Sequence, residues 1–287
     1  MSDFSAAADA AGLSVRRDEF LGRLGSGLLV MGIVNMTPDS FSDGGLFETT
    51  QAALEQARRH VAEGAAIVEV GAESTRPGYT PVPAEVEQAR LAPALRRLVE
   101  DCGAPVSVDT SKASVARFAA GEGVAFVNDV WGLQRDPDMA PAVAENGMGV
   151  FVMHNRDDVD PDRNVVDDMR RFFDLSLKIA EREKIARDRI ILDPGIGFGK
   201  TRQQNFEALA GLPALADYGL PILVGLSRKS LLRELAPDGS TAKVEARLVA
   251  TIAANLAAAA RGATIFRVHD AAEHVAAFRV FDAVARA

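Results

Sequence analysis

Carboxylate and amide side chains follow three of the apolar runs in this sequence, and their types suit one kind of ligand. Asp109 ends the run PVSVD, Asn128 lies in VAFVND, and Asp193 ends RIILD. A buried carboxylate needs hydrogen-bond donors, because burying it without them is costly. An aminopyrimidinone ring offers an amino group beside a ring N–H, which are two parallel donors for one carboxylate. These three residues are therefore candidates for binding a flat heterocycle.

Each aspartate also has a purely structural explanation. Asp109 could cap a helix beginning near Ser111, and Asp193 could pin the turn at DPG through its side chain. For either residue alone, these explanations and ligand binding are equally good. The two aspartates together with Asn128 favour the ligand.

A second set of side chains could hold an anion. Lys229 lies in SRKS directly after the run PILVGL, and Arg267 and His269 lie in RVHD at the end of the last apolar run. Ser227 and Arg76 belong to neighbouring motifs. Fixed cations would neutralise the charge that develops on a departing phosphate or diphosphate. The alternative is a rim of surface ion pairs.

Other signals carry less weight. GIGFGK (195–200) looks like a phosphate loop, but Pro194 stands where that motif requires glycine. Arg228 is better explained by a surface ion pair, and His60 lies in the helix-like segment ARRHVAEG. Cys102 lies at a helix exit, away from the polar residues. The histidines lack dense ligand spacing, so any metal is expected to be Mg²⁺ shared with phosphates.

The candidate residues share a position, because each follows an apolar, β-branched run. These runs alternate with segments in which apolar residues recur three or four apart, as in helices. Apolar strands alternating with helices predict a parallel sheet covered by helices, and eight such units predict a closed (β/α)8 barrel. The expected strands cover residues 28–34, 66–71, 105–110, 124–129, 148–154, 189–195, 221–227 and 263–270.

Barrels of this kind carry their chemistry at the carboxyl ends of the strands, where the polar residues, including Glu73 and His154, fall. The competing fold, a doubly wound sheet, lacks its G-x-G-x-x-G fingerprint after Val34. No Pro/Ser-rich linker divides the chain. We therefore expect an N-terminal extension over residues 1–27 and one barrel domain over 28–287.

The composition excludes several partners. The 287 residues are 48% hydrophobic with a formal net charge of −8, which argues against nucleic acid or an anionic membrane. A single cysteine permits no internal disulfide, and the polar N-terminus lacks the apolar core of a signal peptide, so we expect a cytoplasmic protein. The apolar stretch 248–260 is too short to span a bilayer of about 30 Å and predicts a packed helix.

Seven motifs, in this order and at barrel spacing, closely resemble those of the dihydropteroate synthase family. The resemblance covers roughly residue 28 to the C-terminal helix. Its specificity comes from the set, since any one motif alone is weak. The motifs are NMTPDSFSDGG, ESTRPG, SVDT, VND, ILDPGIGFGK, GLSRKS and RVHD.

This resemblance implies a folate-pathway transferase that uses Mg²⁺. Members of the family join 4-aminobenzoate to 6-hydroxymethyl-7,8-dihydropterin diphosphate, releasing diphosphate and forming 7,8-dihydropteroate. Diphosphate is thought to leave first, so that the aniline nitrogen attacks a pterin cation. The family is commonly homodimeric, and the helix over 248–260 is a candidate interface, although packing on the barrel explains it equally well.

The resemblance also implies roles for individual residues. Of these, Lys229, Arg267, His269, Asp39 and Arg76 are the candidates for a catalytic role. The residues matching the pterin site are Asp109, Asn128, Asp193 and Lys229, and those matching the diphosphate site are Arg267 and His269. The expected Mg²⁺ contact is Asn35. A loop that closes over the substrates carries Thr75 and Arg76, and the positions near the aminobenzoate are Phe198 and Ser230.

The first motif, NMTPDSFSDGG (35–45), is expected to form a lid. Water would quench a pterin cation, so mobile loops must cover the site. Gly44 and Gly45 supply a hinge, and Asn35 and Asp39 supply partners for a cation or metal.

The sequence departs from the family pattern at Ala72, Trp131, Asn155 and Leu231. Trp131 matters most, because its large ring beside Asn128 could line the pterin pocket or shrink it. Sulfonamide sensitivity depends on small differences in geometry and does not follow from the sequence.

Three alternatives remain. Methyltetrahydrofolate corrinoid methyltransferases share the fold and the pterin-binding positions, but they need no diphosphate clamp, so SRKS and RVHD weigh against them. A non-catalytic pterin-binding paralogue would lack loop or anion residues, which are all present here. An unrelated phosphate-binding barrel would have no reason to combine the loop motifs with the carboxylates.

Overall fold

A computed structural model describes this chain over residues 15–36, 46–73, 80–235 and 247–287. Within these residues the apolar runs form eight parallel strands in one sheet. The runs suit a parallel sheet because helices cover one face and the barrel interior covers the other, so both faces are buried. The strands are β1 (Leu29–Asn35), β2 (Ile67–Gly71), β3 (Val106–Asp109), β4 (Phe126–Asp129), β5 (Gly149–Met153), β6 (Ile190–Asp193), β7 (Leu223–Val224) and β8 (Ile265–Val268).

The sheet closes into a barrel. Its strand order, β6-β5-β4-β3-β2-β1-β8-β7, leaves β6 and β7 at the two edges. A single parallel bridge between Leu192 and Ile222 joins these edges, and the Leu192 N–H donates to the Pro221 carbonyl at 2.9 Å. The predicted (β/α)8 barrel is therefore confirmed, although β7 is only two residues long.

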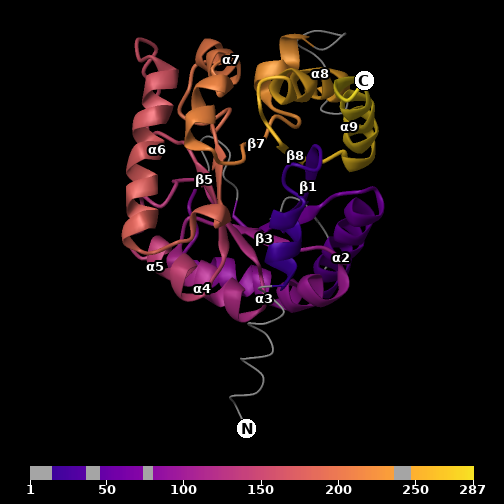
Figure 1. The fold of residues 1–287 in the computed structure, drawn as a ribbon. Coiled ribbons are helices and arrows are strands. Elements are labelled where there is room, and N and C mark those ends of the chain that lie inside the picture. The colour runs from indigo at the N-terminus through magenta and orange to yellow at the C-terminus, as the bar shows by residue number, and fades with distance from the viewer. Residues whose placement is uncertain (1–14, 37–45, 74–79, 236–246) are drawn as a thin grey trace.

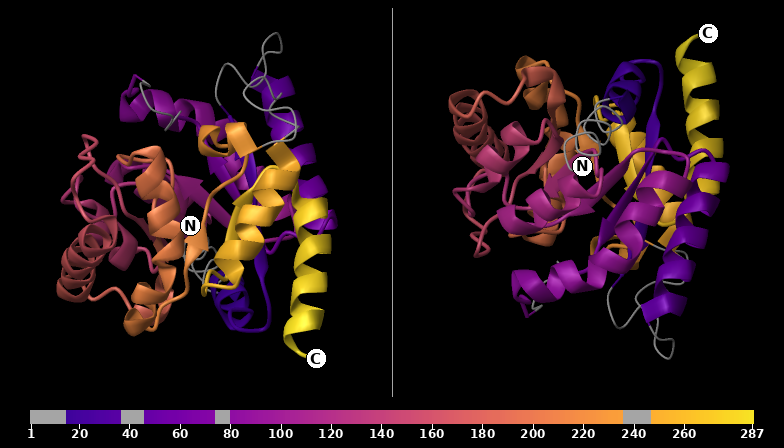
Figure 2. Two further views of the ribbon diagram at one scale, coloured as in Figure 1. Left: turned by 90° about the horizontal axis from the view of Figure 1, so that it is seen from above. Right: turned by 90° about the horizontal axis from the view of Figure 1, so that it is seen from below.

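Helices surround the strands in chain order (Figure 1), and α8 lies beside α9 (Figure 2). The predicted packed helix over 248–260 is confirmed by α8. No helix in the described part of the chain is long and apolar enough to cross a membrane. The helices are α2 (Leu46–Ala62), α3 (Ala84–Asp101), α4 (Ala113–Gly121), α5 (Met139–Glu145), α6 (Val165–Arg182), α7 (Arg202–Ala210), α8 (Leu248–Ala259) and α9 (Ala271–Ala285), with short 3-10 helices η2 (Arg187–Arg189), η3 (Leu212–Tyr218) and η4 (Ser230–Leu235).

Aromatic side chains fill the barrel at the amino-terminal ends of the strands. The rings of Phe126 and Phe151 lie 5.6 Å apart, and Phe20 packs edge-on against Phe126 at 5.2 Å. Gly149 makes room for this packing, since an added Cβ would lie 2.2 Å from a Phe126 ring carbon. Phe20 comes from the helical segment 15–22. The described part of the expected N-terminal extension thus packs into the barrel interior and closes this end.

Candidate active site

Asp109 and Asn128 lie next to each other at the carboxyl ends of β3 and β4. They are partners in the parallel ladder, and both are buried. Asp109 does not cap α4, because that helix begins at Ala113, whose N–H donates to Asp136 Oδ2 at 2.8 Å. Within the described residues, Oδ1 of Asp109 and Oδ1 of Asn128 are buried without a hydrogen-bond partner. Two adjacent buried acceptors are the arrangement that donors on a ligand would complete.

Arg267 on β8 reaches two carboxylates. Its Nη2 lies 3.2 Å from Asp109 Oδ2, and its Nε donates to Glu69 Oε1. Glu69 is completely buried on β2. Glu69 does not stand out in the sequence, because one carboxylate within AIVEVG looks like the solvent-facing position of a strand. The signal available was a charged residue in a run that a parallel barrel buries on both faces.

This crowding changes the protonation of Asp109. Burial, reinforced by the charge of Glu69, raises the pKa of Asp109 to about 8, although Arg267 opposes the shift. Burial acts against the charged form of Arg267 as well, but Glu69 and Asp109 outweigh it and raise the pKa of Arg267. The raised pKa of Asp109 favours the protonated carboxyl, whereas hydrogen-bond donors on a ligand would favour its ionised form.

Asp193 and Lys229 form a second side of the site. Asp193 Oδ1 accepts the Gly195 N–H at 2.7 Å, so the turn explanation for this residue is correct. Burial raises the pKa of Asp193, and the charge of Lys229 opposes this. The Lys229 ammonium donates to the Ile196 carbonyl and lies 4.8 Å from the centre of the Phe198 ring. Burial lowers the pKa of Lys229 to about 8, although Asp193 opposes this.

Gly225, just after β7, brings the two sides together. A Cβ added there would lie 3.8 Å from Arg267 Cβ and 3.9 Å from Lys229 Nζ. The aliphatic stem of Arg267 and the ammonium of Lys229 therefore flank one point on the rim. The structure thus gathers most of the candidate residues into one site: Asp109, Asn128, Asp193, Phe198, Lys229 and Arg267.

His269 is held as a neutral ring. Ser227 Oγ lies 2.9 Å from His269 Nδ1 and accepts the His269 backbone N–H at 3.2 Å. Burial, with the charges of Arg228 and Arg267, lowers the pKa of His269 to about 3. Ser227 Oγ already accepts the His269 backbone N–H, which leaves its hydroxyl proton for Nδ1, and that arrangement would place the ring proton on Nε2. Burial therefore favours a neutral His269, and its role at the diphosphate stays a prediction.

The architecture and these residues match known proteins. A family model described as pterin binding enzyme matches residues 31–269. The dihydropteroate synthase of Clostridium beijerinckii is 40% identical over 264 residues, covering 92% of this chain and 96% of its own length. The chain belongs to the dihydropteroate synthase family.

Solved structures of dihydropteroate synthases share the fold. One, from Clostridium difficile in the presence of pteroic acid, has a TM-score of 0.87 and 40% identity, covering 92% of this chain and 98% of its own. Another, from Xanthomonas albilineans with 4-aminobenzoic acid, has a TM-score of 0.85 and 43% identity, covering 91% and 94%. These likenesses span nearly the whole barrel.

Parts of the dihydropteroate synthase motifs lie outside the described residues. Asp39, Thr75 and Arg76 are among them, so their roles and the proposed lid stay predictions. The described residues beside the second loop are fastened together, because Glu73 Oε1 accepts the Val82 N–H at 2.7 Å. One carboxylate thus joins the residues before and after that loop.

Asn35 stands where a dihydropteroate synthase is expected to contact Mg²⁺. It ends β1, pairs with Gly71 and is partly exposed, and β1 adjoins the strand that carries Arg267. Among the described residues, no group of three or more His, Cys, Asp and Glu side chains could hold a metal. Mg²⁺ keeps several waters and takes few protein ligands, so one amide oxygen shared with substrate phosphates suits it.

Trp131 is the departure from the family pattern nearest to Asn128. The Arg135 guanidinium lies 3.3 Å from the centre of the Trp131 ring. The Trp131 backbone N–H donates to Asp129 Oδ1 at 2.9 Å. Asp129 also accepts the Leu133 N–H at 2.6 Å. The loop after β4 therefore holds Trp131 through its own contacts, and Arg135 covers one face of the ring.

Two residues beside Lys229 differ in character. Arg228 Nη2 lies 2.7 Å from Asp270 Oδ1, which confirms the predicted ion pair. Ser230 is exposed at the start of η4, and its role near the aminobenzoate stays a prediction.

Proposed function

We propose that this chain is a dihydropteroate synthase of folate biosynthesis, a transferase that condenses 6-hydroxymethyl-7,8-dihydropterin diphosphate with 4-aminobenzoate. The observation that carries the proposal is a pair of buried oxygens, on Asp109 and Asn128, that lack partners among the described residues and lie next to the cation Arg267. A pterin ring supplies the donors that these oxygens lack, and its diphosphate supplies the anion.

The pterin lies between the strand ends in this proposal. Asp109 and Asn128 bind one edge of the ring, and Asp193 with Lys229 binds another. Asp193 has one oxygen committed to the Gly195 N–H, so its other oxygen is the one available to the ligand. Ring donors stabilise the ionised carboxylate, so binding lowers the raised pKa of Asp109 and releases a proton.

The diphosphate lies beside Arg267 and His269. Arg267 supplies a fixed positive charge and His269 supplies a neutral Nε2–H, which together stabilise the charge that develops as diphosphate departs. Asn35 would hold Mg²⁺ through its amide oxygen, and the ion would supply further positive charge to the phosphates. Ser227 fixes the His269 tautomer, and therefore which ring nitrogen donates.

The chemistry exchanges one bond for another. The C–O bond to diphosphate breaks and leaves a resonance-stabilised pterin cation, and the aminobenzoate nitrogen then forms the C–N bond and loses one proton. Phe198 and Ser230 bind the aminobenzoate. The loops that contain Asp39, Thr75 and Arg76 exclude water from the cation, because water would compete with the amine.

We also propose that the protein works as a homodimer in the cytoplasm. Exposed valines support an interface over α8 and α9, since Val249, Val280 and Val284 are each more than half exposed. The buried, free thiol of Cys102 suits a reducing compartment. Light scattering of the purified protein tests the assembly, and a monomer at all concentrations would refute it.

The test of function is diphosphate release by purified protein given pterin diphosphate, 4-aminobenzoate and Mg²⁺, with each omitted in turn. We expect release coupled one-to-one to 7,8-dihydropteroate. Tight pterin diphosphate binding without product would indicate a non-catalytic paralogue. Methyl transfer from methyltetrahydrofolate to a corrinoid, with no use of diphosphate, would indicate the related methyltransferases.

A further inference from the structure

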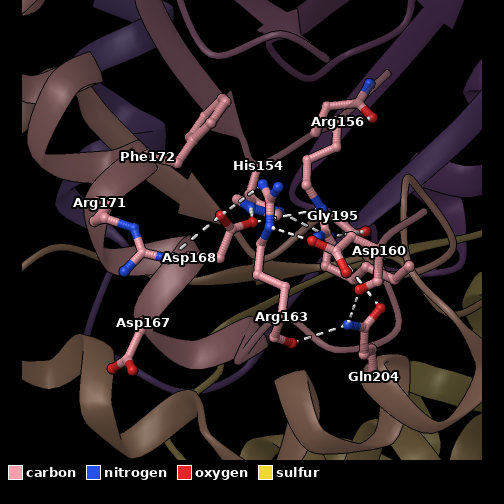
Figure 3. A network of polar contacts seen from close by, with 12 residues as sticks. His154, Arg156, Asp160, Arg163, Asp167, Asp168, Arg171, Phe172, Gly195 and Gln204 are labelled. Carbon is pink, nitrogen blue, oxygen red and sulfur yellow. Dashed lines mark hydrogen bonds and ion pairs between the residues drawn. The ribbon is translucent and has the colours of Figure 1, made fainter. Parts of the chain in front are cut away.

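A second buried ionic cluster contacts the loop between β6 and α7, and Figure 3 shows its polar network. Its centre is Lys200, which is 8% exposed and closes that loop. The Lys200 ammonium lies 2.9 Å from the Gly195 carbonyl, 3.1 Å from the Phe198 carbonyl and 2.8 Å from His154 Nδ1. None of the substrate-binding roles considered above uses this lysine.

The proton positions in this cluster follow from its partners. His154 Nε2 lies 3.0 Å from Asp168 Oδ2, and Arg156 and Arg163 lie 3.4 and 3.3 Å from the same carboxylate. Burial would raise the pKa of Asp168, but His154 and the arginines outweigh it and lower it to about 2. Burial lowers the pKa of His154 to about 4, so the ring is neutral and donates from Nε2. His154 Nδ1 is then an acceptor, and Lys200 donates all three bonds.

Figure 3 shows His154 and Asp168 facing each other, with Gly195 close by. His154 lies just after β5 and Asp168 lies in the first turn of α6. The cluster therefore connects two regular elements to an irregular loop. Lys200 makes this connection, because it bonds to His154 on one side and to the Gly195 and Phe198 carbonyls of the loop on the other.

The loop needs such support because its backbone is irregular. Gly195 and Gly197 have φ values of +64° and +88°, which exclude helix and strand. At Gly195 an added Cβ would also lie 1.8 Å from the His154 carbonyl oxygen, so the loop packs directly on the end of β5. Loops without a regular hydrogen-bond ladder depend on side chains to satisfy their carbonyls.

We propose that Lys200 is a positioning residue for the aminobenzoate side of the site, because it fixes the carbonyls of Gly195 and Phe198 and so places the Phe198 ring beside Lys229. This inference rests on the proposed function. On the pterin side, Asp109 and Asn128 lie on β3 and β4, away from this loop, and only Asp193 meets it, through the Gly195 N–H. Loss of Lys200 therefore weakens aminobenzoate binding selectively.

The test compares Lys200→Met with Lys178→Met, an exposed lysine on α6. Michaelis constants are measured at pH 6.5, below the pKa of Lys200, which burial lowers to about 7. For Lys200→Met we expect the KM for 4-aminobenzoate to rise about tenfold, as loss of one to two net hydrogen bonds implies. We expect the pterin diphosphate Kd from calorimetry to stay within about twofold, and Lys178→Met to match wild type. Equal changes for both substrates, or no change for either, would overturn the proposal.

Asp168→Asn provides a second test if Lys200→Met does not fold. It keeps the volume of the side chain and an acceptor for His154 but removes the negative charge. We expect the same selective rise in the aminobenzoate KM, about threefold, and a change in the pterin Kd instead would overturn the proposal. Wild-type product formation is the separate control: its absence refutes the proposed function, whereas an active wild type without the selective effect refutes only the role of Lys200.

Discussion

Two buried ionic clusters lie at the same end of this barrel, and they differ in how completely their polar atoms are satisfied. In the cluster of Glu69, Arg267 and Asp109, one oxygen of each carboxylate has no partner within the described residues. In the cluster of Asp168, His154 and Lys200, the lysine has three acceptors and both histidine nitrogens are bonded.

The difference separates binding from support. Leaving a buried acceptor without a donor costs about 1–3 kcal/mol, so the first cluster is poised to gain from a ligand with donors. In the second cluster the atoms without a hydrogen-bond partner among the described residues are two nitrogens of Arg156 at its edge, whereas Lys200 and His154 have complete bonds that hold a loop in place. The protonation states agree, since the pKa of Asp109 is raised to about 8 whereas that of Asp168 is lowered to about 2.

Replacing Arg267 breaks the first cluster and should have the largest effect. In Arg267→Lys a cation remains near Glu69, but one ammonium cannot reproduce the guanidinium fork that reaches both carboxylates. We expect turnover to fall roughly 10²–10³-fold, with the free energy of unfolding changed by less than about 2 kcal/mol. Steady-state diphosphate release and urea unfolding measure these quantities. Turnover above a tenth of wild type would contradict the assigned role.

Replacing His154 breaks the second cluster and should mainly affect stability. In His154→Phe the bonds to Lys200 and Asp168 are both lost, and we expect the free energy of unfolding to fall by about 2–3 kcal/mol. With both substrates saturating, turnover should stay within about threefold of wild type. A large loss of turnover without a loss of stability would instead place His154 in the chemistry.

Asp109→Asn sharpens the comparison through pH. The folded-state pKa of Asp109 is raised to about 8, far above the unfolded value of about 3.9. The folded state therefore binds the proton more tightly, and this stabilising contribution is lost as pH rises from about 4 to 8. Asparagine does not titrate, so the free energy of unfolding of the variant does not fall in this way as pH rises. The difference in free energy of unfolding, variant minus wild type, should therefore increase by at least about 1 kcal/mol between pH 5 and pH 8. Urea unfolding at several pH values measures it, and a flat difference would contradict the raised pKa.

Arg228→Gln should have the smallest effect. The Arg228–Asp270 pair lies at the edge of the site, and a partly exposed ion pair contributes about 0–1 kcal/mol. We expect a change in the free energy of unfolding below about 1 kcal/mol and turnover within about twofold of wild type. A loss comparable to that of Arg267→Lys would extend the anion site to Arg228.

The sequence predicts the barrel well because the fold depends on a repeated local pattern. Eight β-branched runs separated by helical periodicity admit few arrangements, and the residues that follow the runs must then share one rim. Asp109, Asn128, Asp193, Lys229 and Arg267 could be placed together on this ground alone.

The partners of these residues could not be predicted, because they come from distant strands. Glu69 and Arg267 are far apart in sequence, and only closure of the sheet through β1 brings them together. Lys200 was set aside with a rejected phosphate-loop motif, since its contact with His154 depends on the conformation of a glycine-rich loop. The sequence also offered Asp109 as a cap for the helix after β3. In the structure Asp136, from the loop after β4, accepts the N–H of Ala113 at the start of that helix.

The single bridge between Leu192 and Ile222 makes the β6–β7 junction the weakest line along which this barrel closes. Few backbone bonds cross it, so local opening there is less costly than between any of the longer paired strands. The loop that carries Phe198 leaves one side of this seam, and the segment that carries Lys229 leaves the other. Opening of the barrel along this seam would separate Asp193 and Phe198 on one side from Lys229 on the other, whereas Asp109 and Asn128 would stay on strands that keep their pairing.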